Sequence, residues 1–311
     1  MTDIAHTADA ATPFQVEALG VRGRLVRLAG STEPVIRAGR YPEPVAALLL
    51  EVQALTAMLA SALKYDGIFT LQIQGDGPIS LLVADATSEG DLRAYAKFDA
   101  DAVDRAATTT DGLVPHMVGA GHMAFTVDQG PDTERYQGIT ELAGTTLAEC
   151  TANYFRQSEQ LDTVIVSAKA PEAGDATGTP GITAAALMVQ RLPSSPLADE
   201  EAAEAWREAA LLAGTLTTAE LLDAGLEAND LLFKLYHERG VRAFPAEPLR
   251  HACRCSRGRV SRTLASFPRS EIEDMCVDNE IAVTCEYCGT EYTFDQPALD
   301  DLFSETEHAN H

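Results

Sequence analysis

Two pairs of cysteines near the end of the chain constrain its fold more than any other feature. Of the six cysteines in 311 residues, four lie in Cys253-x-Cys255 and Cys285-x-x-Cys288. The two pairs are far apart in sequence, so a fold that uses them together needs something that binds both. A Zn²⁺ ion held by four thiolates at about 2.3 Å does this. The spacing therefore predicts one zinc ion bound by Cys253, Cys255, Cys285 and Cys288.

The second pair has the surroundings of a zinc-ribbon turn. Residues 280–284 and 291–294 have the apolar pattern of short strands, and Cys285 to Cys288 lie between them. Gly289 follows the turn, where a positive φ is common and glycine adopts it without steric strain. A helix is expected after the first pair, and Ser270 with Glu273 predicts a capped second helix that ends near residue 277. Residues 250–311 are thus predicted to form a small zinc-binding domain.

Basic residues surround the first cysteine pair, and they allow two interpretations. Neighbouring cations favour deprotonated thiols and compensate the negative charge of a four-thiolate site. The site is then either a structural zinc ribbon with solvated arginines or a thiol redox switch. The arginines concerned are Arg250, Arg254, Arg257, Arg259 and Arg262.

The other two cysteines and the overall charge bound the class of protein. Cys150 falls on the apolar face of a predicted helix, and Cys276 lies beside Ile272 and Met275; both are expected to pack as small apolar groups. Few cysteines in a long chain indicate a reducing compartment, and we expect the cytoplasm. A net charge of −24 and a pI near 4.5 argue against nucleic acid as a partner.

No membrane segment is expected. The N-terminal residues lack a cationic stretch followed by an apolar run, so they do not predict a signal peptide. The most apolar stretch, residues 46–63, is interrupted by Glu51 and Gln53. Its apolar residues recur at helical spacing, which predicts a core helix.

The first part of the chain predicts an α+β domain, an N-terminal antiparallel sheet packed with helices. Residues 1–20 are expected to be a flexible lead-in, and residues 21–193 the core domain. A helix is predicted over residues 146–160, in addition to the apolar helix above. Helices beside an antiparallel sheet are typical of the α+β class. The predicted strands are residues 21–28, 70–74, 79–84, 92–97, 122–129, 136–142, 163–167 and 184–191, of which 70–97 form a meander.

Residues 194–249 are predicted to be a metastable helical linker between the two domains. Helices are expected over residues 202–213 and 230–239, and Thr217 with Glu220 forms a capping box between them. The first helix is largely alanine, with Trp206 and Leu211 as its main large apolar side chains. Alanine favours a helix but buries little area, so the linker should depend on its neighbours to stay packed.

These residues resemble the bacterial 33-kilodalton heat-shock protein family of redox-regulated holdase chaperones. The resemblance runs from about residue 21 to residue 303 and includes both cysteine pairs. Its longest motifs are Leu71-Gln72-Ile73-Gln74-Gly75-Asp76-Gly77-Pro78 and Tyr154-Phe155-x-Gln157-Ser158-Glu159-Gln160, beside Gly23-Arg24-x-Val26-Arg27-Leu28, Leu63-Lys64-Tyr65-x-Gly67 and Phe125-Thr126-Val127-Asp128-Gln129.

The resemblance implies a chaperone and not an enzyme. Cys253, Cys255, Cys285 and Cys288 would bind zinc when reduced, in an inactive monomer. Oxidation would pair Cys253 with Cys255 and Cys285 with Cys288, release the metal and unfold the linker. The active homodimer would then bind unfolding client proteins without ATP. The roles of Cys150, Cys276 and Ser158-Glu159-Gln160 stay open.

Two other classes of function remain as alternatives. A constitutive zinc-ribbon module for protein or nucleic acid would lose its activity on oxidation. A thiol oxidoreductase would use Cys285 and Cys288 repeatedly, but it needs a thioredoxin-like βαβ context that the sequence does not show.

Overall fold

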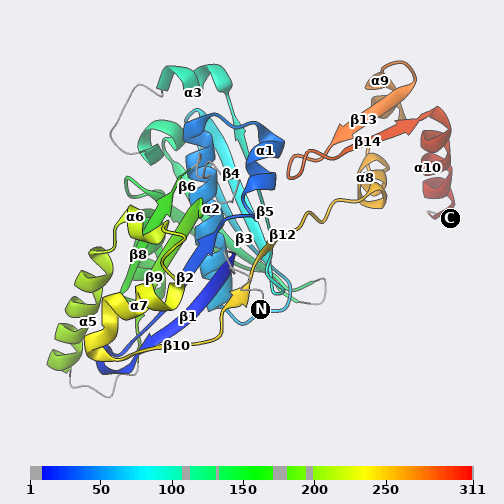
Figure 1. The fold of residues 1–311 in the computed structure, drawn as a ribbon. Helices are drawn as coiled ribbons and strands as arrows, with labels where there is room; N and C mark the ends of the chain where they lie inside the picture. The colour runs from blue at the N-terminus through cyan, green and yellow to red at the C-terminus, as the bar shows by residue number, and fades with distance from the viewer. Residues whose placement is uncertain (1–8, 107–112, 131–132, 171–180, 194–198, 310–311) are drawn as a thin grey trace, which may run out of the picture. The chain divides into compact units, whose positions relative to one another are not determined.

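The computed structural model describes residues 9–106, 113–130, 133–170, 181–193 and 199–309 (Figure 1). The chain divides into two compact units, Met1–Ala252 and Cys253–His311. The first unit holds two sheets and a long helix, and the second holds the four clustered cysteines. The α+β class is confirmed.

One sheet of the first unit is the predicted meander with additions at its edges. Its strand order is β12-β5-β4-β3-β6-β7. All its neighbours pair antiparallel except β12 with β5, which are parallel. The order confirms the meander and both strands expected after it. The strands are β3 (Ile68–Gly75), β4 (Ile79–Thr87), β5 (Asp91–Phe98), β6 (Gly121–Asp128), β7 (Tyr136–Glu141) and β12 (Arg250–His251).

The other sheet of the first unit brings together strands from both ends of its sequence. Its order is β10-β1-β2-β9-β8, and β11 also pairs with β1. The predicted strands at residues 21–28, 163–167 and 184–191 are all present here. The members are β1 (Ala10–Val16), β2 (Val21–Leu28), β8 (Thr163–Lys169), β9 (Ala184–Arg191), β10 (Val241–Ala243) and β11 (Glu247–Pro248).

The prediction of a flexible lead-in is wrong for residues 9–20. β1 pairs with β2 along its whole length and with β10 and β11 on its other side. Phe14 and Val16 are buried, and Leu19 is buried in a short 3₁₀ turn, Glu17–Leu19. The strand depends on partners more than 200 residues later in the chain, which local sequence does not reveal. Residues 1–8 lie outside the described part of the chain.

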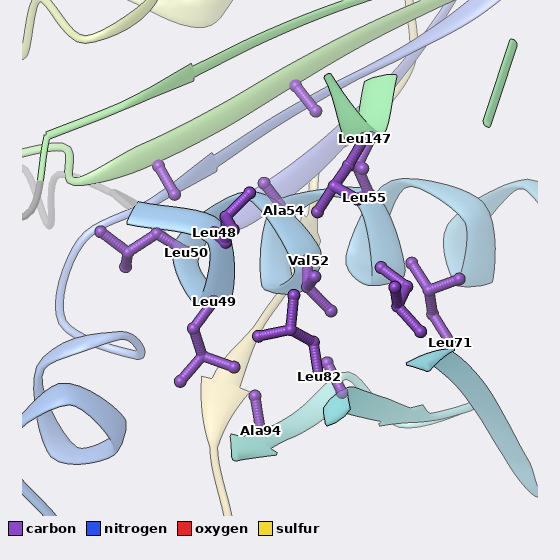
Figure 2. Packing of buried hydrophobic residues seen from close by; sticks show 14 of the residues in the cluster. Leu48, Leu49, Leu50, Val52, Ala54, Leu55, Leu71, Leu82, Ala94 and Leu147 are labelled. Atoms are coloured by element: carbon purple, nitrogen blue, oxygen red, sulfur yellow. The ribbon is translucent and has the colours of Figure 1, made fainter. Parts of the chain in front are cut away.

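Helix α2 (Glu43–Ala62) lies between the two sheets (Figure 1). It contacts β4, β5 and β3 on one side and β9, β2 and β8 on the other. The apolar side chains of α2, among them Leu48 and Leu55, are therefore buried all around the helix and not along a single stripe (Figure 2). It is the one described helix long and apolar enough to span a membrane, but 89% of its most apolar window is buried, as in a core helix.

The carboxylate that interrupts this apolar helix is paired inside the protein. Glu51 is fully buried, and its carboxylate forms an ion pair with Lys169 of β8. It also accepts hydrogen bonds from Ser167 Oγ at 2.8 Å and from the Ala148 amide at 3.2 Å. A buried charge needs such partners, and here they tie α2 to β8 and to α4 (Leu147–Tyr154).

Helix α4, one of several described helical segments around this core, explains two predicted features. Cys150 lies in α4 and is fully buried, as expected. A π-helical turn, Phe155–Glu159, follows α4 and places Glu159 Oε1 2.7 Å from the Tyr154 hydroxyl, which donates to it. Glu159 thus has a packing role in the motif that includes Ser158 and Gln160. The remaining segments are α1 (Glu33–Gly39), α3 (Ala100–Ala106) and η2 (Val114–Val118).

The linker helices pack against the sheet that contains β1 and β2. They are α5 (Asp199–Gly214), α6 (Thr218–Leu221) and α7 (Ala228–Tyr236), and the Thr217–Glu220 capping box is present. Ala209 and Ala213 are fully buried in a second apolar cluster with Phe14, Leu25 and Tyr236. Leu211, one of the large apolar side chains of α5, faces solvent, with 72% of its surface exposed.

The linker is thus part of the first compact unit, which continues to Ala252. The alanine content of residues 194–249 predicts a metastable linker, because alanine buries little area. The small side chains of α5 instead let the helix approach β8 and β9 closely.

Candidate metal centre

The second unit is built on the predicted β-hairpin. Strands β13 (Glu280–Thr284) and β14 (Glu291–Asp295) pair antiparallel, with Cys285 to Thr290 as the connection. The Gly289 amide donates to the Cys285 carbonyl at 2.8 Å, and the Cys285 amide donates to the Thr290 carbonyl at 2.9 Å. Gly289 has a φ of 70°, which confirms the reason for glycine at this position.

The first cysteine pair lies on the irregular segment that leads into α8 (Arg257–Leu264). Ser256 caps this helix by accepting a hydrogen bond from the Arg259 amide. The second predicted helix is α9 (Arg269–Asp274), but it begins after Pro268 without a side-chain cap. The Ser270–Glu273 capping box is therefore wrong, because Ser270 lies inside the first turn and Pro268 sets the start.

The four predicted sulfur atoms converge on one point. All four Sγ atoms lie within 4.8 Å of one another. Cys253 Sγ is 3.7 Å from Cys285 Sγ, and Cys255 Sγ is 3.4 Å from Cys288 Sγ. Zn–S bonds of about 2.3 Å in a tetrahedron separate the sulfurs by about 3.8 Å, so the arrangement fits a four-thiolate zinc ion. All four side chains are partly buried.

Two polar side chains of the hairpin contact the sulfurs, and the sequence did not point to them. The Tyr292 hydroxyl donates to Cys255 Sγ at 3.1 Å, and Thr290 Oγ1 is 3.2 Å from Cys288 Sγ. Thr290 directly precedes β14 and Tyr292 is its second residue, and side chains two apart along an extended chain point to the same side. That period of two, starting at the turn, was the signal available in the sequence. Such outer contacts orient metal ligands and tune their basicity.

The protein groups around the cysteines separate the pKa values of the two knuckle thiols. Burial raises the pKa of Cys285 to about 12. Burial also raises the pKa of Cys288, but hydrogen bonds with Thr290 and with the sulfurs of Cys255 and Cys253 together outweigh it and bring that pKa to about 7. The phenol of Tyr292, which donates to Cys255, has its pKa raised to about 12. Cys288 is therefore the thiol of this turn that deprotonates first.

The arginines near the site differ in what they contact. The Arg257 guanidinium lies 4.2 Å from the centre of the Phe294 ring and donates to the Thr293 carbonyl at 2.7 Å. Arg250 lies on β12 of the first unit and pairs there with Asp91 at 2.6 Å. Arg259 and Arg262 are exposed on α8.

The apolar core of the second unit is small. α10 (Gln296–Ala309) completes it, and its fully described part supplies Leu299. Cys276 packs at the edge of this core with Sγ 3.3 Å from the Ile272 carbonyl oxygen, and it is not among the four clustered cysteines. The buried members of the core are Leu264, Ile272, Ile281, Phe294 and Leu299.

The fold and the site place the chain in the class of α+β proteins with two sheets around a buried helix, followed by a four-cysteine ribbon. The chain belongs to the Hsp33 family: the family model described as Hsp33 protein matches residues 9–295. The resemblance found in the sequence is thus confirmed.

Relatives of nearly full length support this assignment. A 33 kDa chaperonin of Caulobacter vibrioides is 40% identical over 308 residues, which cover 96% of this chain and 99% of that protein. A 33 kDa chaperonin of Pseudomonas fluorescens is 37% identical over 313 residues, covering 98% and 96%. The crystal structure of the 33 kDa chaperonin of Thermotoga maritima has a TM-score of 0.78 at 22% identity, covering 97% of this chain and 99% of that one, and shows the same fold.

Proposed function

We propose that this chaperone is an ATP-independent holdase of the cytoplasm that is controlled by the redox state of Cys253, Cys255, Cys285 and Cys288. The observation that carries the proposal is the convergence of their four Sγ atoms within 4.8 Å. A bound zinc ion would hold the two sequence-distant pairs together and stabilise the small second unit. The reduced, zinc-bound protein is the inactive monomer.

Oxidation by a peroxide needs no co-reactant besides protons from the solvent. Two zinc-bound thiolates lose two electrons to one hydrogen peroxide, which takes up two protons from the solvent, and the products are one disulfide and two waters. Two such reactions convert all four ligands into two disulfides, and a disulfide sulfur is no longer a thiolate ligand.

The proposed pairing is Cys253 with Cys255 and Cys285 with Cys288, and it rests on the resemblance. The recorded close contacts run across the two pairs instead, from Cys253 to Cys285 and from Cys255 to Cys288. Peptide mapping of the oxidised protein decides between the two pairings. Bonds within each pair leave the two sequence segments free to separate, whereas bonds across the pairs would keep them joined.

Loss of the metal is proposed to unfold the linker and expose the client surface. α5 and α7 cover an apolar face of the first unit that includes Phe14, Leu25 and Leu187. Unfolding these helices would expose this face together with Leu231 and Tyr236, and exposed apolar patches bind other proteins. The same surface would support a homodimer in the oxidised state and the capture of unfolding clients.

Light scattering from a heat-unfolding client protein tests the proposal. We expect the zinc-loaded, reduced chain to leave aggregation unchanged and the peroxide-treated chain to suppress it. Cys285→Ser should abolish this control by redox state, whereas Cys276→Ser, outside the cluster, should keep it. Suppression by the reduced chain, with loss on oxidation, would instead support a constitutive zinc-ribbon binding module.

A further inference from the structure

Arg27 occupies a position of the first unit that strand alternation assigns to apolar residues. On β2, Val21 and Leu25 face the cluster beneath the linker helices, and Arg27 is the next residue on that face. Its cross-strand neighbours are Ala10 of β1 and Ala185 of β9, whose small side chains leave room for it. Arg27 is only 7% exposed.

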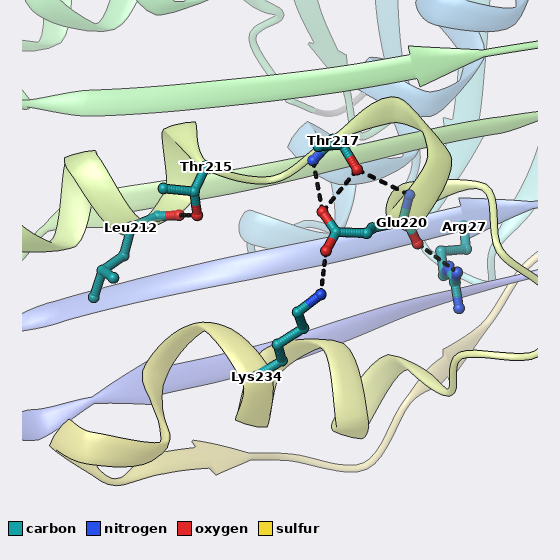
Figure 3. A network of polar contacts seen from close by, with 6 residues as sticks. All are labelled: Arg27, Leu212, Thr215, Thr217, Glu220 and Lys234. Carbon is teal, nitrogen blue, oxygen red and sulfur yellow. Dashed lines mark hydrogen bonds and ion pairs between the residues drawn. The ribbon is translucent and has the colours of Figure 1, made fainter.

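The buried guanidinium donates to main-chain carbonyls of the linker. Nε donates to the Leu221 carbonyl at 2.9 Å, and one terminal nitrogen donates to the carbonyls of Glu220 at 3.3 Å and Asp223 at 2.5 Å. The other terminal nitrogen donates to the Leu226 carbonyl. All four acceptors lie at the end of α6 and in the turn that follows, as the Arg27–Glu220 contact in Figure 3 illustrates.

The segment that Arg27 holds has little support of its own. α6 has four residues, too few to be stable as an isolated helix. Its N-terminus is closed by the Thr217–Glu220 capping box, and Glu220 pairs with Lys234 of α7 (Figure 3). The carbonyls at its other end carry a partial negative charge and need donors. Arg27 supplies donors to four carbonyls of this segment at once.

We propose that Arg27 is a positioning residue of the switch, which keeps α6 and the turn to Leu226 docked on β2 in the inactive state. This inference rests on the proposed function. The guanidinium and the carbonyls all gain water when the linker opens, so the contact specifies the closed arrangement without making release prohibitive. Apolar packing of α5 and α7 supplies the rest of the closed state.

The charge on Arg27 fits this role. Burial lowers its pKa, whereas the nearby Asp223 and Glu227 carboxylates act in the opposite direction. A guanidinium remains protonated at neutral pH, so the donors are permanently present. The planar guanidinium of Arg27 reaches four carbonyls at once. The compact ammonium of a lysine at this position could not.

Hydrogen exchange of the reduced, zinc-loaded full chain tests this inference in Arg27→Met and Arg27→Lys. Arg24→Met is the matched control, because Arg24 is also on β2 and partly buried, but donates to the carbonyls of Ser61 and Gly23. We expect residues 218–236 to exchange about tenfold faster or more in Arg27→Met, and less so in Arg27→Lys, with β3 and β5 unchanged. Zinc content should stay that of the wild type.

The same samples are assayed for suppression of client aggregation without oxidant. We expect Arg27→Met to suppress it while reduced, and Arg24→Met to remain inactive. Unchanged exchange at residues 218–236 would overturn the proposal, as would equal acceleration in β3 and β5, which marks a general loss of stability. If the linker opens selectively but the reduced variant stays inactive while oxidised wild type is active, Arg27 does not control the switch. If the oxidised wild type does not suppress aggregation, the proposed function is contradicted. The hydrogen-exchange result still tests whether Arg27 holds the linker.

Discussion

The two compact units reach their folds by different means. The first unit buries α2 on every side between two sheets, and its core includes Leu48, Leu55 and Leu71, all fully buried. Among the residues whose burial the structure describes, the second unit buries only five apolar side chains completely or nearly so. So small an apolar core leaves much of the conformational entropy of ordering the unit to be offset by other interactions.

The comparison teaches where control can be placed in such a chain. A unit with a large core keeps its fold whatever its cysteines do, and here its Cys150 is buried with a pKa raised to about 11, chiefly by burial. We propose that the second unit, with its small core, depends on a metal ion bound by its four clustered cysteines, so that chemistry at these sulfurs changes its fold. The linker packs on the first unit yet leads into the second, which makes it the segment that both can influence.

Removal of the metal is expected to have the largest effect on this contrast. Structural zinc supplies about 10–16 kcal/mol of apparent binding free energy, as much as the whole stability of a typical domain. Chelation, or Cys285→Ser, should abolish the protection of β13 and β14 in hydrogen exchange, while β3 to β5 keep theirs. Cys276→Ser is the control and should retain both. A second unit that stays protected after chelation would contradict the dependence on metal.

A cavity in the first core should give the next largest effect and leave the metal site untouched. Leu55 is fully buried in α2, so Leu55→Ala should lower the free energy of unfolding by about 2–5 kcal/mol in urea titration. Leu211 has the same side chain on α5 but is 72% exposed, and Leu211→Ala should change it by about 0.5 kcal/mol or less. Equal losses at the two positions would show that burial does not set the difference between them.

A smaller effect is expected from the hydroxyl that contacts the zinc site. Tyr292→Phe removes the donor to Cys255 Sγ and should lower zinc affinity by about 10- to 100-fold in competition with a chelating dye. Tyr65→Phe is the control, because the Tyr65 hydroxyl donates to the Ala86 carbonyl in the first unit and should not affect the metal. Unchanged affinity in Tyr292→Phe would mean that the hydroxyl does not orient the ligand.

Local sequence patterns sufficed where a feature depends on nearby residues. The meander of β3, β4 and β5 follows from alternating strands and short turns, and Gly289 follows from the geometry of one turn. The Cys285-x-x-Cys288 motif predicts the hairpin around it for the same reason. The four clustered cysteines could be grouped in advance because two closely spaced cysteine pairs are typical of a metal site in a chain of this kind.

Features set by distant partners could not be predicted. β1 pairs with β10 and β11, which lie more than 200 residues later, and the sequence before residue 20 contains no strong strand pattern. The second sheet beside α2 and the close packing of alanines in α5 depend on the same long-range contacts. The role of Arg27 required the alignment of β2 with the turn after α6, which only the folded chain brings together.

The smallest expected effect concerns pH and the linker's capping box. The Lys234 hydrogen bond and the Thr217 donors lower the pKa of Glu220 to about 2, from an ordinary value of 4.5. Because the folded-state pKa is depressed, the stabilisation is complete above about pH 4.5 and is lost as the pH falls toward 2. The contacts lie near the surface and are screened by solvent, so they contribute under about 1 kcal/mol.

An NMR titration of the Glu220 carboxyl and the Thr217 amide measures this effect without unfolding the protein. Both signals should titrate together near pH 2 at low salt, and Lys234→Met should move the midpoint up toward the ordinary value of 4.5. A Glu220 midpoint near 4.5 in the wild type would show that the capping box does not lower the pKa of the Glu220 carboxyl group. The closed arrangement of the linker would then depend only on Arg27 and apolar packing. Arg27→Met would in that case open the linker more than it would if the capping box also contributed.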